Sequence, residues 1–532
     1  MEHIQPAMPL RARPAWHVTR ATAVVLLVAA CPLTARAALA QAPAAAPGPG
    51  PDQPTSPNQP AAPAASDQSA PAPSDPCAPP SPDQSGIWQR SNLLGELGGM
   101  RPGLCSQGIS FGLQETSEVL GNVAGGINRG ADYDGMTQMS LGIDTAKAWP
   151  GGTFNITALQ IHGRNLSTDN LDTLQTASGI EADRATRLWE LWYQQASPDG
   201  RADLKLGQQA IDLEFMTSQG AGIFINSAMG WAALPSEDLY AGGPTYPLSS
   251  LGARLRVRPT DALTLQTGVF DDNPPGGAFA NDSQRLGAEA AGAAFSLRTG
   301  ALWITEIQYA INQSPAAPSP NAQSQNVPSQ NAQSSGLPGT YKLGFWYDTG
   351  EFPDQQFDTA GVSLANPASN GRPRMHSGNY SAYAVADQVV WPGDANGAQA
   401  ISLFARMMAA PPDRNLISFS ADGGLTVSAP LPVAGHDNSK DMFGIGFGVA
   451  QVSDNAAALD RDTPFFTGVP IPVRGTETFI EITYQYNVAP WWMLQPDFQY
   501  VIMPGGGLQN PSDPPRRIGN EVVLGLRTTI TF

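Results

Sequence analysis

The chain has 532 residues, of which 14% are charged, and it contains 55 glycines and 49 prolines. This composition disfavours helical bundles and favours many short strands joined by turns. After the N-terminal region, no apolar run reaches about 18 residues, which excludes a helical membrane span but not a membrane β-barrel. The formal net charge of −17 argues against nucleic acid as a partner.

The first 40 residues have the features of an export signal. Three arginines precede the apolar run ATAVVLLVAA, and the string ALA (38–40), with small residues at its first and last positions, provides a cleavage site. We therefore expect residues 1–40 to be a cleaved signal peptide. The segment Val28–Cys31 also resembles a lipoprotein cleavage site, so lipidation of Cys31 is the alternative. Cleavage after Ala40 removes four of the 29 basic residues and one of the 46 acidic residues, which leaves a net charge of −20.

Two segments have the composition of disordered chain. Residues 41–85 are dominated by Pro, Ala, Ser and Gln and cannot bury a core, so a disordered leader is predicted. The stretch 313–339 repeats the string NAQS and predicts a solvated loop insertion. Cleavage of the signal leaves Cys77 and Cys105, which we expect to form a disulfide in an oxidising compartment. Two unpaired thiols are the alternative.

The sequence from Ile109 onward alternates between apolar and polar residues, which is typical of half-buried strands. In WELWY, for example, Trp189 is expected on the same face as Leu191, opposite Glu190. The clearest segments are WELWY (189–193), LGARLRVR (251–258), YKLGFWY (341–347), FGIGFGV (443–449) and EITYQYNV (481–488).

Seventeen candidate strands follow one another along the chain. Bacterial single-chain barrels have even strand numbers, so sixteen strands are predicted, and the surplus candidate is placed within 340–450. The candidates lie near residues 109, 136, 153, 186, 202, 250, 262, 288, 301, 340, 380, 398, 415, 441, 475, 492 and 520.

Short and long connections alternate between these strands. Short turn sequences lie near residues 150, 197, 258, 298 and 489, whereas 164–186, 211–249, 350–378 and 503–519 are long and polar. Tight turns at one end and long loops at the other are typical of a membrane β-barrel. A β-sandwich also alternates, but a chain of this length would need several domains with linkers. Residues 86–532 are therefore predicted to form one all-β, transmembrane antiparallel barrel domain.

The C-terminal segment EVVLGLRTTITF (521–532) ends on an aromatic residue. Alternate apolar residues such as Leu524 and Leu526 are expected to face lipid, and Arg527 the lumen. A closing strand pairs with the first strand, so it leaves no free edge, and Phe532 can lie in the interfacial aromatic belt. Phe532 is also predicted to be the signal for outer-membrane assembly.

Six long motifs occur along the chain: IWQRSNLLGELGGMRPGLCSQGISF (87–111), SSLGARLRVRPTDALTLQTGVFDDNP (249–274), GTYKLGFWYDTGEFPD (339–354), GNYSAYAVADQVVW (378–391), ISLFARMMAAPPDRN (401–415) and APWWMLQPDFQYVIMPGG (489–506). These segments resemble the carbohydrate-selective porins of the OprB family, in the order that the family has them. The resemblance covers about 87–532 and implies a sixteen-stranded outer-membrane barrel that passes monosaccharides, above all glucose, by diffusion. The chain departs from the family at Glu96-Leu97, where an Asp-Trp pair is usual, and in its long leader and the insertion at 313–339.

A sugar channel needs polar side chains that exchange hydrogen bonds with hydroxyl groups, and it must hold its substrate weakly. Candidates are residues opposite an apolar face; for each, ordinary wetting of the lumen or an ion pair across the wall is the alternative. Trp192 could instead lie in the aromatic girdle. The arginine row, Arg254, Arg256 and Arg258, needs compensating carboxylates or a solvated channel. The pore-lining candidates are Glu190, Trp192, Arg254, Arg256, Glu306, Lys342, Arg406, Glu481, Gln495, Asp497 and Arg527.

Motifs for catalysis and metal binding are weak. The string GISFG (108–112) matches a nucleophile elbow, but that motif needs a strand–turn–helix context and here lies within a predicted strand. His162 and His376 are the histidines in barrel segments, and neither has an evident serine partner. The acidic segment FDDNPPGG (270–277) is interpreted as a solvated loop rather than a cation site. No enzyme activity, cofactor or metal is therefore expected.

The predicted function is passive diffusion of small sugars such as glucose across the bacterial outer membrane. An outer-membrane hydrolase built on a barrel and a structural or adhesive envelope barrel are the alternatives. The expected partners are small sugars, outer-membrane lipid and the barrel-assembly machinery, with no nucleic acid. The chain is expected to be a monomer or a homotrimer.

Overall fold

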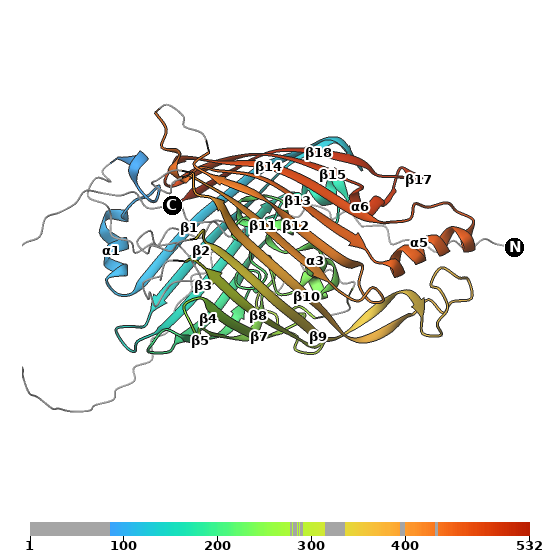
Figure 1. The fold of residues 1–532 in the computed structure, drawn as a ribbon, viewed down its shortest axis with the longest axis horizontal. Helices are drawn as coiled ribbons and strands as arrows, with labels where there is room; N and C mark the ends of the chain where they lie inside the picture. Colours follow the sequence, from blue (N-terminus) through green and yellow to red (C-terminus); the bar gives the residue numbers. More distant parts are fainter. Residues whose placement is uncertain are drawn as a thin grey trace, which may run out of the picture. The chain divides into compact units, whose positions relative to one another are not determined.

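Sixteen antiparallel strands close into a barrel, in the order β1-β18-β15-β14-β13-β12-β11-β10-β9-β8-β7-β6-β5-β4-β3-β2 (Figure 1). This confirms the predicted fold. The computed structural model describes residues 86–276, 279, 285, 287, 291–313, 336–393, 399–430 and 435–532. The signal peptide with Cys31, the leader with Cys77 and residues 314–335 of the insertion lie outside these ranges.

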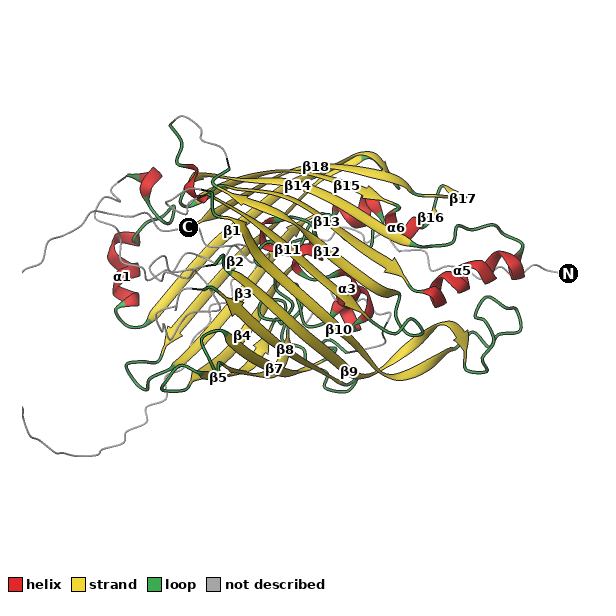
Figure 2. Ribbon diagram, viewed as in Figure 1, coloured by secondary structure: helices red, strands yellow, loops and turns green. Residues whose placement is uncertain are grey.

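Strands dominate the described chain and helices are short (Figure 2). None of the helices in the described ranges is long and apolar enough to cross a membrane. The barrel strands are β1 (Ile109–Gly126), β2 (Gly130–Asp144), β3 (Gly152–Gly163), β4 (Ala185–Ala196), β5 (Ala202–Gln209), β6 (Ser250–Val257), β7 (Leu263–Asp271), β8 (Ala301–Ile311), β9 (Gly339–Asp358), β10 (Pro373–Trp391), β11 (Ala400–Ala409), β12 (Ile417–Ser428), β13 (Met442–Val452), β14 (Thr476–Ala489), β15 (Trp492–Ile502) and β18 (Gly519–Thr531). Outside the barrel wall are β16 (Gln509–Asn510) with β17 (Asp513–Arg517), α1 (Met100–Cys105), α2 (Ser227–Gly230), α3 (Ala233–Asp238), α5 (Asp454–Thr467) and α6 (Pro504–Gly507), and the single turns η1 (Ile87–Gln89), η2 (Leu97–Gly99), η3 (Ser167–Leu171), η4 (Ala221–Ile223), η5 (Tyr240–Gly242) and η6 (Asn438–Lys440).

The surplus candidate strand is the one near 288, and its predicted location within 340–450 is wrong. Described residues 291–300, between β7 and β8, form turns and irregular backbone. Ala291 and Leu297 have φ of 50° and 48° there, and Gly292 has φ of 76°, which is incompatible with an extended strand. The alternation of apolar and polar residues in this segment therefore does not correspond to a strand in the described residues 291–300.

The closing strand has the predicted alternation. In β18, Leu524 and Leu526 are 49% and 51% exposed on the outer face, whereas Val523 and Arg527 are buried on the inner face. β18 pairs with β1 from Thr531 opposite Gln114 onward, so the backbones of the first and last barrel strands satisfy each other.

Trp189 departs from the predicted face. The pairing of β3 with β4 shifts register between Thr157 and Ala158, and this irregularity inserts one extra residue into β4. Trp189 is therefore 2% exposed and packs inward, on the same side as Glu190, while Leu191 is 45% exposed on the outer face. The prediction that Trp189 shares a face with Leu191 is wrong, because a bulge resets the period of two.

The connections at the two ends of the barrel differ mostly as predicted. The turns near 150, 197, 258 and 489 are short, but the prediction of a short turn near 298 is wrong, because this residue lies in the long connection between β7 and β8. The predicted long loop at 350–378 is about half strand, because β9 extends to Asp358 and β10 begins at Pro373, which leaves a loop at 359–372. Figure 1 shows this extended hairpin beside α5, to which it is joined when Gln356 and Ser363 donate to Asp462, at 3.1 and 2.7 Å. The chain order places the β8–β9 connection, which carries the insertion, at the end with the tight turns.

The segment 210–249 between β5 and β6, called the inner loop below, lies inside the barrel wall. Its residues Phe215, Met216 and Trp231 share one hydrophobic cluster with inward side chains from seven strands, β7 to β13, including Trp346 of β9 and Met408 of β11. A chain segment that contacts seven strands of one wall must run across the interior. The β3–β4 loop, 164–184, also packs inward, with Leu171 in a cluster with wall residues of β1 and β18.

Candidate functional site in the barrel interior

The eleven predicted pore-lining residues all lie on the inner face of the wall, but each is at most 9% exposed. They are therefore covered by other parts of the protein rather than open to a wide lumen. Seven of them bond directly to the inner loop, namely Glu190, Arg254, Glu306, Lys342, Arg406, Glu481 and Gln495.

Arg406 of β11 is the most extensive anchor of the inner loop. Its guanidinium donates to the carbonyl oxygens of Met216 and Gly230, both at 3.0 Å, and to those of Ala228 and Met229. Its Nε donates to Asp422 of β12 at 2.9 Å. A planar guanidinium with five donors suits this task, because a lysine could not satisfy so many acceptors in fixed directions.

Carboxylates and amides of the wall hold the inner loop from other sides. Glu481 of β14 accepts the backbone N–H groups of Ile225 and Asn226, at 2.5 and 3.1 Å. Gln495 of β15 donates to the carbonyl of Ile223 at 2.7 Å. These bonds satisfy loop backbone groups that would otherwise be buried without partners, which costs about 1 to 3 kcal/mol for each group.

Two further anchors hold the inner loop near Met216. Glu306 of β8 accepts the Met216 N–H at 2.9 Å and the Tyr383 hydroxyl at 2.8 Å. Lys342 of β9 donates to the carbonyl of Thr217 at 2.6 Å. Together with Glu190 of β4 and Arg254 of β6, the anchors come from seven strands, β4, β6, β8, β9, β11, β14 and β15, which fixes the loop across the barrel.

The arginine row on β6 is compensated by carboxylates. Arg254 pairs with Asp203 and also donates to Glu214 of the inner loop at 3.2 Å. Arg256 pairs with Asp203 at 2.8 Å, and Lys205 pairs with Glu214 at 2.7 Å. The like charges therefore do not require a solvated channel for compensation.

The three remaining predicted residues are Trp192, Arg527 and Asp497, and their partners lie on the wall or in the β3–β4 loop. Trp192 is 4% exposed and faces inward, with the Lys205 ammonium 4.2 Å from its ring centre, so the girdle alternative is wrong. Arg527 pairs with Glu118 at 2.7 Å and donates to Ser178 of the β3–β4 loop at 3.0 Å. Asp497 accepts from Gln499 at 3.0 Å.

The sequence analysis did not identify several polar side chains on the loops inside the barrel that are partly or fully exposed. On the inner loop, Glu214, Thr217, Ser227 and Glu237 are partly exposed and Ser236 is exposed. Burial and the nearby charge of Glu477 raise the pKa of Glu237 to about 7. Burial likewise raises the pKa of Glu181, in the β3–β4 loop, to about 8, although hydrogen bonds from Ser167 oppose the shift. The sequence offers no signal for these residues, since they lie in polar segments without periodicity.

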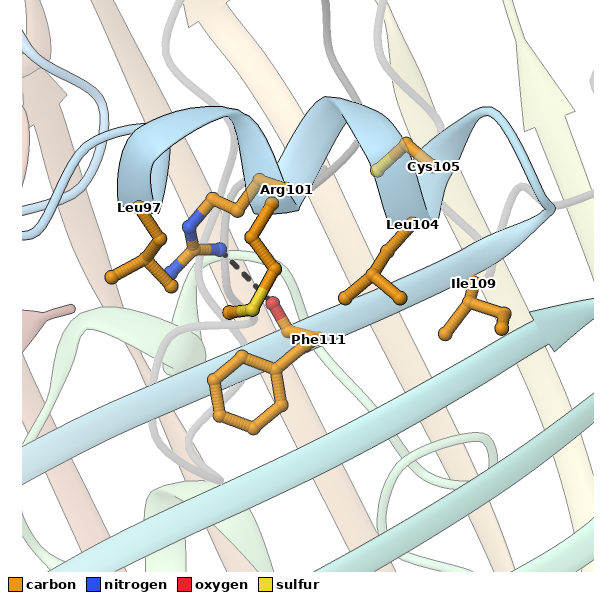
Figure 3. A pocket seen from close by; sticks show the side chains of 7 residues that line it. Leu97, Arg101, Leu104, Cys105, Ile109 and Phe111 are labelled. Atoms are coloured by element: carbon orange, nitrogen blue, oxygen red, sulfur yellow. Dashed lines mark hydrogen bonds between the residues drawn. The ribbon is translucent and has the colours of Figure 1, made fainter.

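The N-terminal segment is hydrogen-bonded to the last two residues of the chain, Thr531 and Phe532. Arg101 of α1 donates to the carbonyl of Phe111 at 3.0 Å (Figure 3). It also donates to the main-chain oxygen of Phe532. Leu93 N–H donates to the carbonyl of Thr531 at 2.8 Å. Figure 3 shows the small pocket under α1, lined by Leu97, Met100, Arg101, Leu104, Cys105, Ile109 and Phe111, which lies outside the interior.

Of the two cysteines in the predicted disulfide, the structure describes only Cys105. Cys105 at the end of α1 is disulfide-bonded. Because Cys77 lies outside the described residues, the Cys77–Cys105 pairing stays a prediction.

Ser110 and the two barrel histidines, His162 and His376, lie on strands β1, β3 and β10. Ser110 lies within β1, opposite Gly142 of β2, so GISFG is extended strand and not a nucleophile elbow. His376 contacts Asp354 at 2.9 Å and His162 contacts the Tyr133 hydroxyl at 3.0 Å. Within the described ranges, no group of three or more His, Cys, Asp or Glu side chains is arranged to hold a metal.

The prediction of a solvated loop at 270–277 is wrong for the described residues 270–276, of which all are buried except the half-buried Pro275. Asp271 and Asp272 are 3% and 1% exposed. Asp272 accepts from the Thr299 hydroxyl at 2.6 Å, so the segment is drawn against the neighbouring loop.

Comparisons with known proteins agree with this architecture. A family model described as "Carbohydrate-selective porin, OprB family" matches residues 128–532. Porin B of Pseudomonas aeruginosa is 23% identical over 459 residues, covering 83% of this chain and 91% of that protein. The putative porin QuiX of Acinetobacter baylyi is 22% identical, covering 78% and 89%.

A solved structure shares the fold. The high-pH structure of Pseudomonas putida OprB superposes with a TM-score of 0.70 at 23% identity, covering 84% of this chain and 100% of that one. The family model spans most of the barrel, including the strands that carry the anchors of the inner loop. The chain belongs to the carbohydrate-selective porins of the OprB family.

Proposed function

We propose that this outer-membrane porin passes small neutral sugars such as glucose by passive diffusion, along a path bordered by the inner loop. The observation that carries the proposal is the placement of the inner loop, which crosses the interior of a closed barrel and is anchored by charged wall residues. Such an obstruction narrows a barrel of sixteen strands, which would otherwise enclose a wide aqueous channel. A narrowed, polar path favours small solutes over large ones.

The exposed groups of the inner loop suit uncharged, hydroxyl-rich substrates. Thr217, Ser227 and Ser236 present hydroxyl groups that both donate and accept hydrogen bonds. Glu237, whose pKa is raised to about 7, is partly protonated at neutral pH and can then donate as well as accept. Arg254, Arg256, Arg406 and Arg527 are paired with carboxylates, so these charges do not oppose the passage of a neutral sugar.

Export and assembly form part of the same proposal. Cleavage after Ala40 would release the chain into the periplasm, and the barrel-assembly machinery would read the C-terminal strand that ends at Phe532. Outer-membrane lipid would then surround the exposed apolar residues of the outer face, such as Leu524 and Leu526.

Liposome swelling with a graded series of sugars tests the substrate class. Vesicles containing the purified barrel are expected to swell fastest with monosaccharides, more slowly with disaccharides, and little with trisaccharides, because the inner loop limits the cross-section. Vesicles without protein provide the control. Equal swelling rates for all sugars, or no swelling with glucose, would contradict the proposal.

A further inference from the structure

Two buried carboxylates, Asp272 and Asp348, lie side by side at the loop end of strands β7 to β9. Asp271, the last residue of β7, lies opposite Ala301, the first residue of β8. Asp348 of β9 lies opposite Leu302 of β8. Because Asp272 directly follows β7, the register brings it to the same level of the wall as Asp348. Both residues are 1% exposed, and their carboxyl groups lie within hydrogen-bonding reach of each other.

Each of the two carboxylates has one oxygen with a donor and one without. Asp272 accepts from the Thr299 hydroxyl through Oδ1, at 2.6 Å. Asp348 accepts from the Gly350 N–H through Oδ1, at 2.8 Å. The Oδ2 atoms of both residues are buried and have no hydrogen-bond partner. Since an ionised carboxylate only accepts hydrogen bonds, the two groups cannot satisfy each other.

Two glycines make room for these carboxylates. A Cβ on Gly300 would lie 2.7 Å from Asp272 Oδ2 and 2.8 Å from the Thr349 hydroxyl oxygen. A Cβ on Gly350 would lie 3.0 Å from Asp272 Oδ2 and 3.1 Å from Asp348 Oδ1. The oxygens of three side chains therefore meet where a side chain at either glycine would fill the space.

This acidic group lacks a compensating positive charge. The neighbouring Asp271 is 3% exposed, and one of its oxygens also has no hydrogen-bond partner. Within the described ranges, no lysine, arginine or histidine forms an ion pair with Asp271, Asp272 or Asp348. Taking like charges out of water without compensation is strongly unfavourable. A proton shared by Asp272 and Asp348 would neutralise one charge, whereas a divalent cation neutralises two.

We propose that Asp272 and Asp348 bind a divalent cation, Ca²⁺, at the outer mouth of the barrel. Ca²⁺ takes oxygen ligands in a flexible geometry, whereas Mg²⁺ demands a near-ideal octahedron. The two Oδ2 atoms supply ligands from both carboxylates, and the Thr349 hydroxyl lies beside them. The long loops of a membrane barrel lie at its outer end, so the external medium supplies the cation.

The bound cation joins the β7–β8 connection, which carries Asp272, to β9, which carries Asp348. The inner loop rests on the same part of β9, since a Cβ on Gly350 would lie 2.8 Å from Cε2 of Tyr240. The Tyr240 hydroxyl also donates to the carbonyl of Glu351 at 2.6 Å. Ca²⁺ thus stabilises the rim that supports the inner loop, whichever solute the channel passes. The site uses two carboxylates, so it is distinct from the groups of three or more metal-binding side chains that the described ranges lack.

Calcium titration of the purified barrel tests the site. After removal of divalent cations with a chelator, isothermal titration calorimetry is expected to show one Ca²⁺ bound per wild-type chain. Asp272→Asn is expected to bind Ca²⁺ about tenfold more weakly or less, because affinity depends on the number of charged ligands. The control Asp261→Asn/Asp513→Asn changes two carboxylates whose side chains are 78% and 52% exposed, and it should bind as the wild type does. A wild type that binds no Ca²⁺, or equal binding by Asp272→Asn, would overturn the proposal.

Asp348→Asn separates cation binding from a general loss of stability. Its amide can donate to Asp272 and removes one charge, so the variant is expected to fold and to need no cation. A ligand that binds only the folded state stabilises it, so Ca²⁺ should raise the temperature at which the wild type loses its heat-modifiable mobility by several degrees. The same temperature should stay unchanged for Asp348→Asn. A wild type whose unfolding ignores Ca²⁺, or a variant that responds as the wild type does, would contradict the proposal.

Discussion

Replacement of Arg406 with alanine is expected to release the inner loop and enlarge the channel. The substitution removes the donors to four loop carbonyls and leaves the buried Asp422 carboxylate without its partner. Removing one member of a buried ion pair typically costs about 3 to 5 kcal/mol. Because the β-strands keep their own backbone ladder, we expect this loss to appear as a detached loop. Single-channel conductance in planar bilayers should therefore rise and become noisier.

Two control variants separate this effect from a general loss of stability. Arg406→Lys keeps the charge beside Asp422 but loses most of the donors to the carbonyls, so an intermediate conductance is expected. Arg516→Ala removes an arginine whose side chain is 82% exposed and which pairs with Asp513 at 3.3 Å. It should conduct as the wild type does. Wild-type conductance from Arg406→Ala would show that the loop does not depend on this anchor.

Deletion of Phe532 is expected to lower the yield of folded barrel strongly without changing the pore of the barrels that form. Phe532 N–H donates to the carbonyl of Leu113 at 2.9 Å, and its main-chain oxygen accepts from Arg101. The two bonds fasten the end of the closing strand to β1 and α1, and a hydrogen bond to a charged group contributes about 1.5 to 3 kcal/mol.

The fraction of protein with the heat-modifiable mobility of a folded barrel measures this effect. Phe465→Ala, which removes a ring that is 80% exposed on α5, provides the matched control and should assemble normally. Arg101→Ala removes the hydrogen bond to the main-chain oxygen of Phe532 and is therefore expected to lower the yield of folded barrel by a smaller amount than the deletion does. A wild-type amount of folded barrel after deletion of Phe532 would refute the account of the C-terminal strand.

The barrel could be predicted from the sequence because strand alternation is a local signal. Side chains of β18 alternate with a period of two, so the outward placement of Leu524 and the inward placement of Arg527 follow from the sequence alone. The surplus strand near 288 could not be excluded in this way. The same apolar spacing occurs there, but the positive φ angles of Ala291 and Leu297 prevent an extended strand. Alanine and leucine rarely adopt positive φ, so the sequence does not indicate this conformation.

The inward direction of the candidate residues was likewise predictable, but their surroundings were not. Alternation places Arg406 and Glu481 on the inner face, and the structure buries both because the inner loop lies over them. Their partners, Ala228 and Ile225, are far away in the sequence and belong to a polar segment without regular period. The sequence therefore suggests open pore-lining charges, whereas the structure shows anchors for a loop. The hydrogen bond from Arg254 to Glu214 likewise exists only because the inner loop lies inside the barrel.

Conductance of single barrels in planar bilayers, with glucose added on one side, tests the central claim most directly. The claim is that a sixteen-stranded barrel, narrowed by an anchored inner loop, provides a path for small sugars. We predict discrete conductance steps in the wild type and their partial, concentration-dependent block by glucose, because a sugar in a narrow path displaces ions. Discrete steps that glucose leaves unchanged, or the absence of any channel, would contradict the account.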